Sequence, residues 1–198
     1  MNFYWYWLIA YLSGSLPFAL WITRLVKKTD LRDSGSGHAT TTNTVRQAGF
    51  AAGALVLILD LSKGFLPVFL AYRAGLPAWA MAITAAFAVL GHCYPVFAGF
   101  RGGMGLAVTG GALLAVSPLA MLVALALLIL LLLTIRHAAR AALFAGLLAP
   151  LSLWAVHLRG VELWIMTAAG LIIALRFAMN WNRQYRELWL DRDKTESK

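Results

Sequence analysis

The sequence predicts an all-α integral membrane protein of about seven transmembrane helices, one of them short, with glycine-rich loops on its cytoplasmic face. Hydrophobic residues make up 61% of the 198 residues and charged residues only 13%, and the mean hydropathy is +0.75. At about 20 residues per crossing, the chain has room for six or seven helices. Seven apolar windows lie at about residues 3–26, 50–72, 78–97, 105–117, 119–135, 140–157 and 161–179. We expect a single domain over residues 1–190 and a short polar tail over 191–198.

Two of these windows need separate justification. The first, 3–26, has the length of a secretory signal, but it lacks a basic start and a small-residue cleavage site, so we expect a retained helix. The fourth, 105–117, is ended by Pro118 and is too short to cross a bilayer at 1.5 Å per residue. It is therefore predicted to be a partial helix, or one that begins inside the protein. The other windows are long enough to span.

The positive charges predict the orientation. Fourteen of the 17 lysines and arginines fall in four segments, 24–49, 98–104, 135–141 and 176–198. With seven crossings these segments share one side of the membrane, and the positive-inside rule makes that side the cytoplasm. We expect the amino terminus outside and the carboxyl terminus in the cytoplasm. Because these cations sit at the ends of apolar windows, the net charge of +9 indicates headgroup contact and topology rather than nucleic-acid binding.

The stretch 91–109, GHCYPVFAGFRGGMGLAVT, predicts an anion pocket at the membrane face. It interrupts two apolar windows with glycines, a proline and one cation, Arg101. Irregular backbone at membrane depth survives only where it is packed in protein or lines a polar cavity, and glycine-rich backbone can direct several N–H groups toward one centre. We expect His92 to fix this loop by hydrogen bonding. No metal is expected there, because no second ligand follows at helical spacing, and the single Cys93 excludes an internal disulfide.

The loop 30–49, DLRDSGSGHATTTNTVRQAG, offers a second set of phosphate-binding groups. The turn at Gly35, Ser36 and Gly37 can expose successive N–H groups, the threonines at 40–42 offer hydroxyls, and Arg46 offers a planar fork. The alternative interpretation is a flexible, solvated loop.

Charged residues also occur inside and just after the apolar windows. Asp60 and Lys63 lie one turn apart within a window, where they can pair; such a pair can fix helix packing, serve a function, or do both. After the last window, Arg176, Asn180, Arg183 and Arg186 are spaced to share one helix face, although contact with lipid headgroups explains them equally well.

Five segments in this order resemble the bacterial acyl-phosphate:glycerol-3-phosphate acyltransferases, the PlsY family. They are GSLPF (14–18), DLRDSGSG followed by TNTVRQAG (30–49), DLSKG (60–64), GHCYPVFAGFRGGMG (91–105) and an R…N-x-x-R pattern (176–183). The resemblance covers nearly the whole chain. It implies a seven-helix enzyme of the bacterial inner membrane that transfers an acyl group from acyl phosphate to glycerol-3-phosphate without a cofactor or metal. The product is lysophosphatidic acid, an intermediate of phospholipid biosynthesis.

The resemblance also implies the site residues. Both substrates carry phosphate, so arginine, lysine and glycine-rich backbone are suitable groups. As catalytic residues it implies Ser36, Arg46 and Asn180. As phosphate- or substrate-binding residues it implies Gly35, Gly37, Asn43, Lys63, His92, Arg101, Gly102, Gly103 and Gly105. The acyl chain is expected to lie among the apolar helices.

The chain departs from the family pattern at four places in the predicted site. Met104 stands where the G-G-K-G lysine is expected, Ala139 and Ala142 stand for two serines, and Phe177 stands for a histidine. In the first motif, His38 replaces an asparagine. These losses support an alternative: a catalytically lost paralogue that binds lipid or a phosphorylated ligand, or regulates an active relative. Arg140 is a candidate replacement for the missing lysine. A small transporter is a further alternative, motivated by the intramembrane charges, but no internal repeat is evident.

Overall fold

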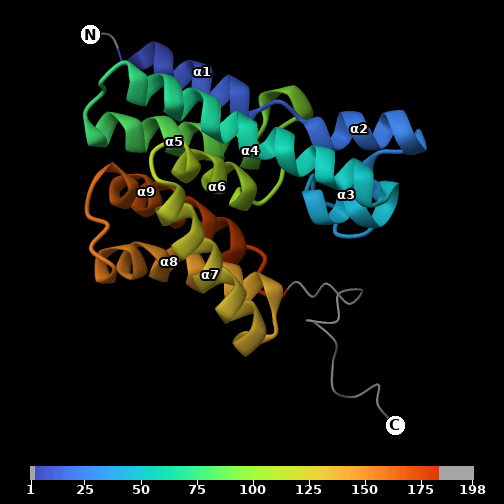
Figure 1. The fold of residues 1–198 in the computed structure, drawn as a ribbon. Helices are drawn as coiled ribbons and strands as arrows, with labels where there is room; N and C mark the ends of the chain where they lie inside the picture. Colours follow the sequence, from blue (N-terminus) through green and yellow to red (C-terminus); the bar gives the residue numbers. More distant parts are fainter. Residues whose placement is uncertain (1–2, 183–198) are drawn as a thin grey trace.

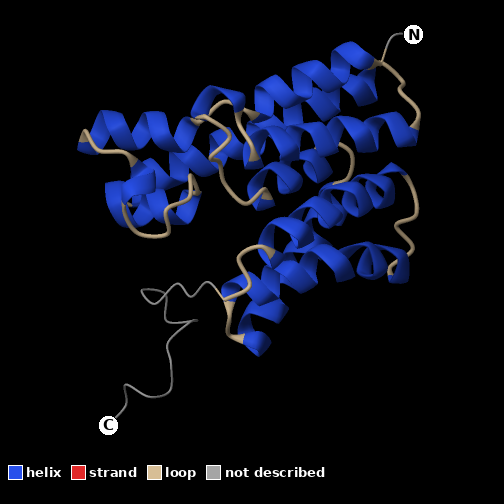
Figure 2. Ribbon diagram, turned by 180° about the vertical axis from the view of Figure 1, so that it is seen from behind, coloured by secondary structure: helices blue, strands red, loops and turns tan. Residues whose placement is uncertain are grey.

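The computed structural model describes residues 3–182, and helices and loops make up this part of the chain (Figures 1 and 2). The predicted tail at 191–198, together with Arg183 and Arg186, lies outside the described residues. In chain order the elements are α1 (Tyr4–Gly14), α2 (Phe18–Lys27), the 3-10 turn η1 (Leu31–Asp33), α3 (Thr41–Ala48), α4 (Phe50–Arg73), α5 (Ala78–Cys93), the 3-10 turn η2 (Val96–Ala98), α6 (Leu106–Leu114), α7 (Pro118–Ile135), α8 (Ala138–Ala155) and α9 (Val161–Ala178).

Six helical segments among the described residues are long and apolar enough to cross a membrane. They are Tyr4–Lys27, Phe50–Arg73, Ala78–Ala98, Pro118–Ile135, Ala138–Ala155 and Val161–Ala178. The remaining predicted window, the fourth, is the short helix α6, which at nine residues extends only about 13 Å. The prediction of an all-helical membrane protein is therefore confirmed for the described residues.

Turn residues set several helix boundaries. The first segment is interrupted between Gly14 and Phe18, where Pro17 begins α2. Pro17 has no N–H to donate, so the helix cannot continue through it undisturbed. At the start of α7, the hydroxyl of Ser117 accepts a hydrogen bond from the amide of Ala120 at 3.1 Å, and Pro118 occupies the first turn. The prediction that Pro118 separates two helices is correct.

Small residues let neighbouring helices approach closely. A Cβ added at Gly111 of α6 would collide with the backbone oxygen of Leu61 on α4. Gly146 of α8 and Gly170 of α9 face each other in the same way. Such contacts are typical of membrane helices, which pack by close van der Waals contact rather than by the hydrophobic effect. By contrast, only 6% of the α7 segment is buried, so α7 forms the outer wall of the bundle.

The polar segments gather at one end of the bundle. Figure 1 shows α2, α3, the turn between α7 and α8, and the end of α9 on one side, opposite the start of α1 and the turns that follow α4 and α8. The loop 30–49 and the end of the last apolar window therefore lie at the same end of the molecule.

Candidate functional site

A cavity of about 610 Å³ lies between α4, α6, α7, α8 and α9. Its wall is polar at one end, where the threonines 40–42, Asp60 and His92 line it. Beyond these groups the lining is almost entirely apolar: leucines from α4, α6 and α7, alanines from α8, and Met166, Ile173 and Phe177 from α9. Such a cavity can hold an amphiphilic molecule with its polar group at the threonine end.

A buried ion pair stands at the polar end. Lys63 Nζ lies 2.9 Å from Asp60 Oδ1, and both side chains are less than 5% exposed. Lys63 Nζ also donates a hydrogen bond to the backbone oxygen of Leu16 at 3.0 Å, at the interruption between α1 and α2. His92 Nδ1 lies 3.9 Å from the same Asp60 oxygen. The predicted pairing of Asp60 with Lys63 is correct, and the pair joins α4 to the α1–α2 interruption and to α5.

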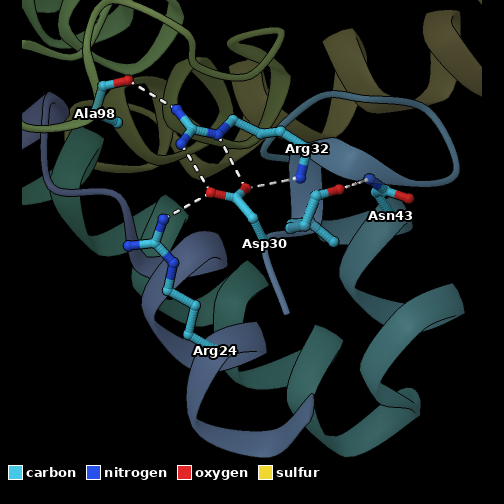
Figure 3. A network of polar contacts seen from close by, with 6 residues as sticks. Arg24, Asp30, Arg32, Asn43 and Ala98 are labelled. Carbon is cyan, nitrogen blue, oxygen red and sulfur yellow. Dashed lines mark hydrogen bonds and ion pairs between the residues drawn. The ribbon is translucent and has the colours of Figure 1, made fainter. Parts of the chain in front are cut away.

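The loop before α3 is held by a network of polar contacts centred on Asp30 and Asn43 (Figure 3). The Asp30 carboxylate accepts hydrogen bonds from Arg24 Nη2 at 2.6 Å and from Arg32 Nε and Nη2 at 3.0 and 2.8 Å. These bonds, those from the Arg32 side chain above all, hold the pKa of Asp30 well below its ordinary value. Arg32 Nη1 also donates to the backbone oxygen of Ala98 at 2.9 Å, so the network ties this loop to η2.

Asn43 organises the same loop from inside. Its fully buried side chain donates through Nδ2 to the backbone oxygens of Leu31, Ser34 and His38 at 3.0–3.2 Å. Its Oδ1 accepts from the amide of Ser36 at 3.3 Å. The loop is therefore packed around a buried amide, which argues against a flexible segment.

The glycine-rich stretch packs closely against His92. The amide of Gly103 donates to the backbone oxygen of His92 at 3.0 Å, and a side chain at Gly103 would collide with the imidazole. Gly105 precedes α6 with a φ of 89°, a conformation that glycine adopts readily. Arg176 Nε donates to the backbone oxygen of Gly103 at 3.2 Å, and its guanidinium lies 4.8 Å from the Tyr94 ring centroid. The expectation that this backbone is packed in protein is met. The bond from the Gly103 amide is accepted by the backbone carbonyl of His92, so hydrogen bonding of the loop by the His92 side chain stays a prediction.

The predicted site residues are placed as follows. His92 and Gly105 line the cavity itself. Lys63 pairs with Asp60, which lines the cavity, and Gly102 and Gly103 pack against His92. Arg101 is exposed beside the glycines, and the side chain of Asn180 donates through Nδ2 to the backbone oxygen of Arg176 at 2.8 Å. The others lie in the loop before α3 or in α3: Gly35, Ser36, Gly37, Asn43 and Arg46. Their direct contact with a substrate stays a prediction.

Sequence reasoning underrated two residues. Asp60 is not among the predicted binding residues, although its pair with Lys63 is a functional candidate, yet its side chain lines the cavity. Arg176 was attributed to headgroup contact as readily as to the site, yet it holds the glycine-rich backbone. The spacing of Asp60 from Lys63 is a sequence signal that could have included Asp60 in the predicted site. No local sequence pattern connects Arg176 with Gly103.

The four departures from the family pattern lie together. Met104, Ala139, Ala142 and Phe177 belong to one buried apolar cluster, completed by Leu143, Ile173 and Ala174. Met104, Ala142 and Phe177 also line the cavity next to its polar end. Arg140 does not replace the missing lysine in this arrangement: its guanidinium lies 4.9 Å from the Trp181 ring centroid, and it is not part of the cavity wall. Among residues 3–182, no group of three or more potential metal ligands is present.

The sequence is similar to glycerol-3-phosphate acyltransferases in comparisons with both a family model and individual proteins. A family model described as glycerol-3-phosphate acyltransferase matches residues 4–187. A glycerol-3-phosphate acyltransferase from Shewanella woodyi is 39% identical over 166 residues, which cover 84% of this chain and 82% of the relative. One from Listeria welshimeri is 38% identical over 148 residues, covering 73% and 74%.

The same fold is found in solved structures. The crystal structure of PlsY (YgiH), an integral membrane glycerol 3-phosphate acyltransferase, in its glycerol 3-phosphate form has a TM-score of 0.81 at 36% identity and 92% coverage of both chains. The lysophosphatidic acid form has a TM-score of 0.80 at 34% identity, with 92% of this chain and 91% of that chain covered.

Proposed function

Because the chain belongs to the glycerol-3-phosphate acyltransferase family, we propose that it transfers an acyl group from acyl phosphate to the 1-hydroxyl of glycerol-3-phosphate. The products are lysophosphatidic acid and inorganic phosphate, so the reaction belongs to phospholipid biosynthesis. The resemblance found in the motifs is confirmed, and the protein is a multi-pass membrane protein. The donor, acyl phosphate, is inferred from the motif resemblance.

The observation that carries the proposal is the two-part cavity. Its polar end is built from hydroxyls, Asp60 and His92, and its body is apolar. An acyl phosphate has the same division, with a charged reacting group at one end and a hydrocarbon chain behind it. The cavity would therefore place the reacting carbonyl at the polar end, beside the loop that carries Arg46 and the glycine-rich stretch.

The proposed reaction needs positioning more than activation. The 1-hydroxyl oxygen bonds to the acyl carbonyl carbon, the bond from that carbon to the phosphate oxygen breaks, and the phosphate leaves with the electron pair. The hydroxyl proton ends on the released phosphate. Since the leaving group is already good, the protein's task is to hold two anions together and neutralise them. We assign Arg46 and the backbone around residues 102–105 to phosphate, with Ser36 and Asn180 beside the reacting groups.

We place the protein in the bacterial inner membrane, with the start of α1 outside and the carboxyl terminus in the cytoplasm. The clustering of the segments 24–49 and 135–141 with the end of α9 at one end of the bundle supports this orientation, because they carry eight of the twelve lysines and arginines among residues 3–182. The polar end of the cavity would then open toward the cytoplasm, which is the side that supplies glycerol-3-phosphate.

The test is the incorporation of labelled glycerol-3-phosphate into lysophosphatidic acid by Arg46→Ala in lipid nanodiscs. We expect a loss of about 100-fold or more, as for other groups that stabilise developing charge. The matched control is Arg73→Ala, since Arg73 is exposed at the far end of α4 and stacks on Phe69. A folded Arg46→Ala variant with the wild-type rate would refute the assignment of the site. A folded wild-type protein without transfer would favour the paralogue that only binds.

A further inference from the structure

The apolar body of the cavity has a defined length. Three helices line it with pairs of residues about 11 positions apart: Met121 and Leu132 on α7, Ala138 and Ala149 on α8, and Met166 and Phe177 on α9. At 1.5 Å per residue, each pair spans roughly 16 Å. Three neighbouring helices therefore give the same length independently.

The two ends of this body are packed differently. At the end near the polar groups, Met104 and Phe177 form the apolar cluster described above, and Leu128 of α7 packs against it. At the other end, Leu113 and Ala149, only 1% and 2% exposed, lie in a second buried cluster.

The far end is closed by protein. Met166 is 3% exposed and belongs to this second cluster, and Met121 packs against it from α7. The side chains that line the far wall come from α6, α7, α8 and α9. A chain that enters from the polar end therefore meets a wall rather than lipid.

We propose that this far wall, formed chiefly by Ala149 and Met166, measures the length of the acyl chain. The proposal rests on the function proposed above and adds its chain-length specificity. An extended chain advances about 1.2 Å per bond, the value that the protein backbone itself gives. The body of roughly 16 Å then holds about 14 carbons, so a myristoyl chain fills it and a stearoyl chain does not fit fully extended.

The discrimination comes from packing. Lipid tails are as apolar as the cavity wall, so a methylene gains little by leaving the bilayer for the protein. A chain that is too long must bend out between the helices or displace buried side chains, and overpacking a close-packed interior is unfavourable. The prediction is a maximum in the chain-length profile, with a steeper fall on the long side.

Two substitutions move the wall in opposite directions. Ala149→Leu fills the end of the cavity and should shorten the preferred chain by roughly two carbons, given about 1.2 Å per bond. Met166→Ala removes side-chain volume from the same far wall and should lengthen the preferred chain by a similar amount. Misfolding cannot produce opposite shifts in two variants. Ala155→Leu is the matched control, because Ala155 is on the same helix, is exposed and does not line the cavity.

Two readouts separate this proposal from the proposed function. The first is acyl transfer with a series from decanoyl to stearoyl phosphate, where the optimum should move as stated and stay unmoved in Ala155→Leu. The second needs no turnover: a myristyl phosphate that carries a diazirine on its last carbon should label peptides containing Ala149 or Met166.

Labelling at the far wall without any transfer would support the length gauge and refute the proposed function. Unchanged chain-length optima in both cavity variants would overturn the gauge. Labelling confined to the lipid-facing side of α7 would overturn it as well, because the chain would then leave the cavity sideways.

Discussion

Removing Lys63 should leave a buried carboxylate without its nearest cation. In the folded protein Lys63 Nζ lies 2.9 Å from Asp60 Oδ1, and both side chains are almost fully buried. Water screens such a pair poorly. In Lys63→Met, the other ionisable group near that oxygen is His92 Nδ1 at 3.9 Å.

The expected cost follows from these contacts. Breaking a buried ion pair by removing one partner costs about 3–5 kcal/mol, and the lost hydrogen bond to the Leu16 oxygen adds about 1 kcal/mol. Removing both charges in Asp60→Asn/Lys63→Met should cost much less than the two single substitutions together, because no uncompensated charge remains. The control is Lys27→Met, an exposed lysine at the end of α2, for which we expect a change within about 0.5 kcal/mol.

The free energy of unfolding can be measured by titration with sodium dodecyl sulfate in mixed micelles. The wild type, Asp60→Asn, Lys63→Met and the double variant form a double-mutant cycle, and Lys27→Met is the control for loss of a surface charge. Equal stabilities for Lys63→Met and Lys27→Met would refute the view that this pair joins α4 to the first helical segment. Strict additivity in the cycle would show that the two charges do not interact.

Three further perturbations test other parts of the structure. Asn43→Ala removes four hydrogen bonds from a buried side chain, worth about 2–4 kcal/mol, and should make the loop before α3 exchange its amide hydrogens much faster; unchanged exchange would contradict its role. Because the pKa of Asp30 is lowered in the folded protein, the ionised carboxylate stabilises the fold fully at neutral pH, and this contribution is lost as the pH falls below about 4. Asp30→Asn should therefore abolish that part of the acid sensitivity of thermal unfolding. Gly111→Ala should destabilise the bundle by about 1–3 kcal/mol because its Cβ meets the Leu61 backbone. Gly110→Ala, whose nearest contact is a flexible side-chain carbon at 3.4 Å, should cost less. Similar melting temperatures for these two variants would show that α4 and α6 can separate freely.

Much of the fold was predictable because hydrophobicity and turn residues act locally. The windows at 50–72, 119–135 and 161–179 correspond to α4, α7 and α9 within a residue or two. The short α6 followed from the nearness of Pro118 to the glycine-rich stretch. The sequence predicts one helix over the first window, whereas α1 and α2 are separated at Pro17, and Lys63 of a distant helix donates a hydrogen bond to the Leu16 carbonyl at this break.

The site was less predictable, because its contacts join distant parts of the chain. Motif resemblance selected Asn43, but only the folded loop shows that its amide is enclosed by backbone oxygens. The departures at Met104 and Phe177 were visible in the sequence as isolated losses. Their packing into one cluster depends on how α9 lies against the start of α6, which no local pattern encodes.

The most direct test of the proposed function is phosphate release by the purified full-length protein in lipid, given palmitoyl phosphate with and without glycerol-3-phosphate. We predict release that depends on glycerol-3-phosphate and is matched mole for mole by lysophosphatidic acid. A protein shown to be folded that releases no phosphate in response to the acceptor, or releases it without forming lysophosphatidic acid, would contradict acyl transfer from acyl phosphate.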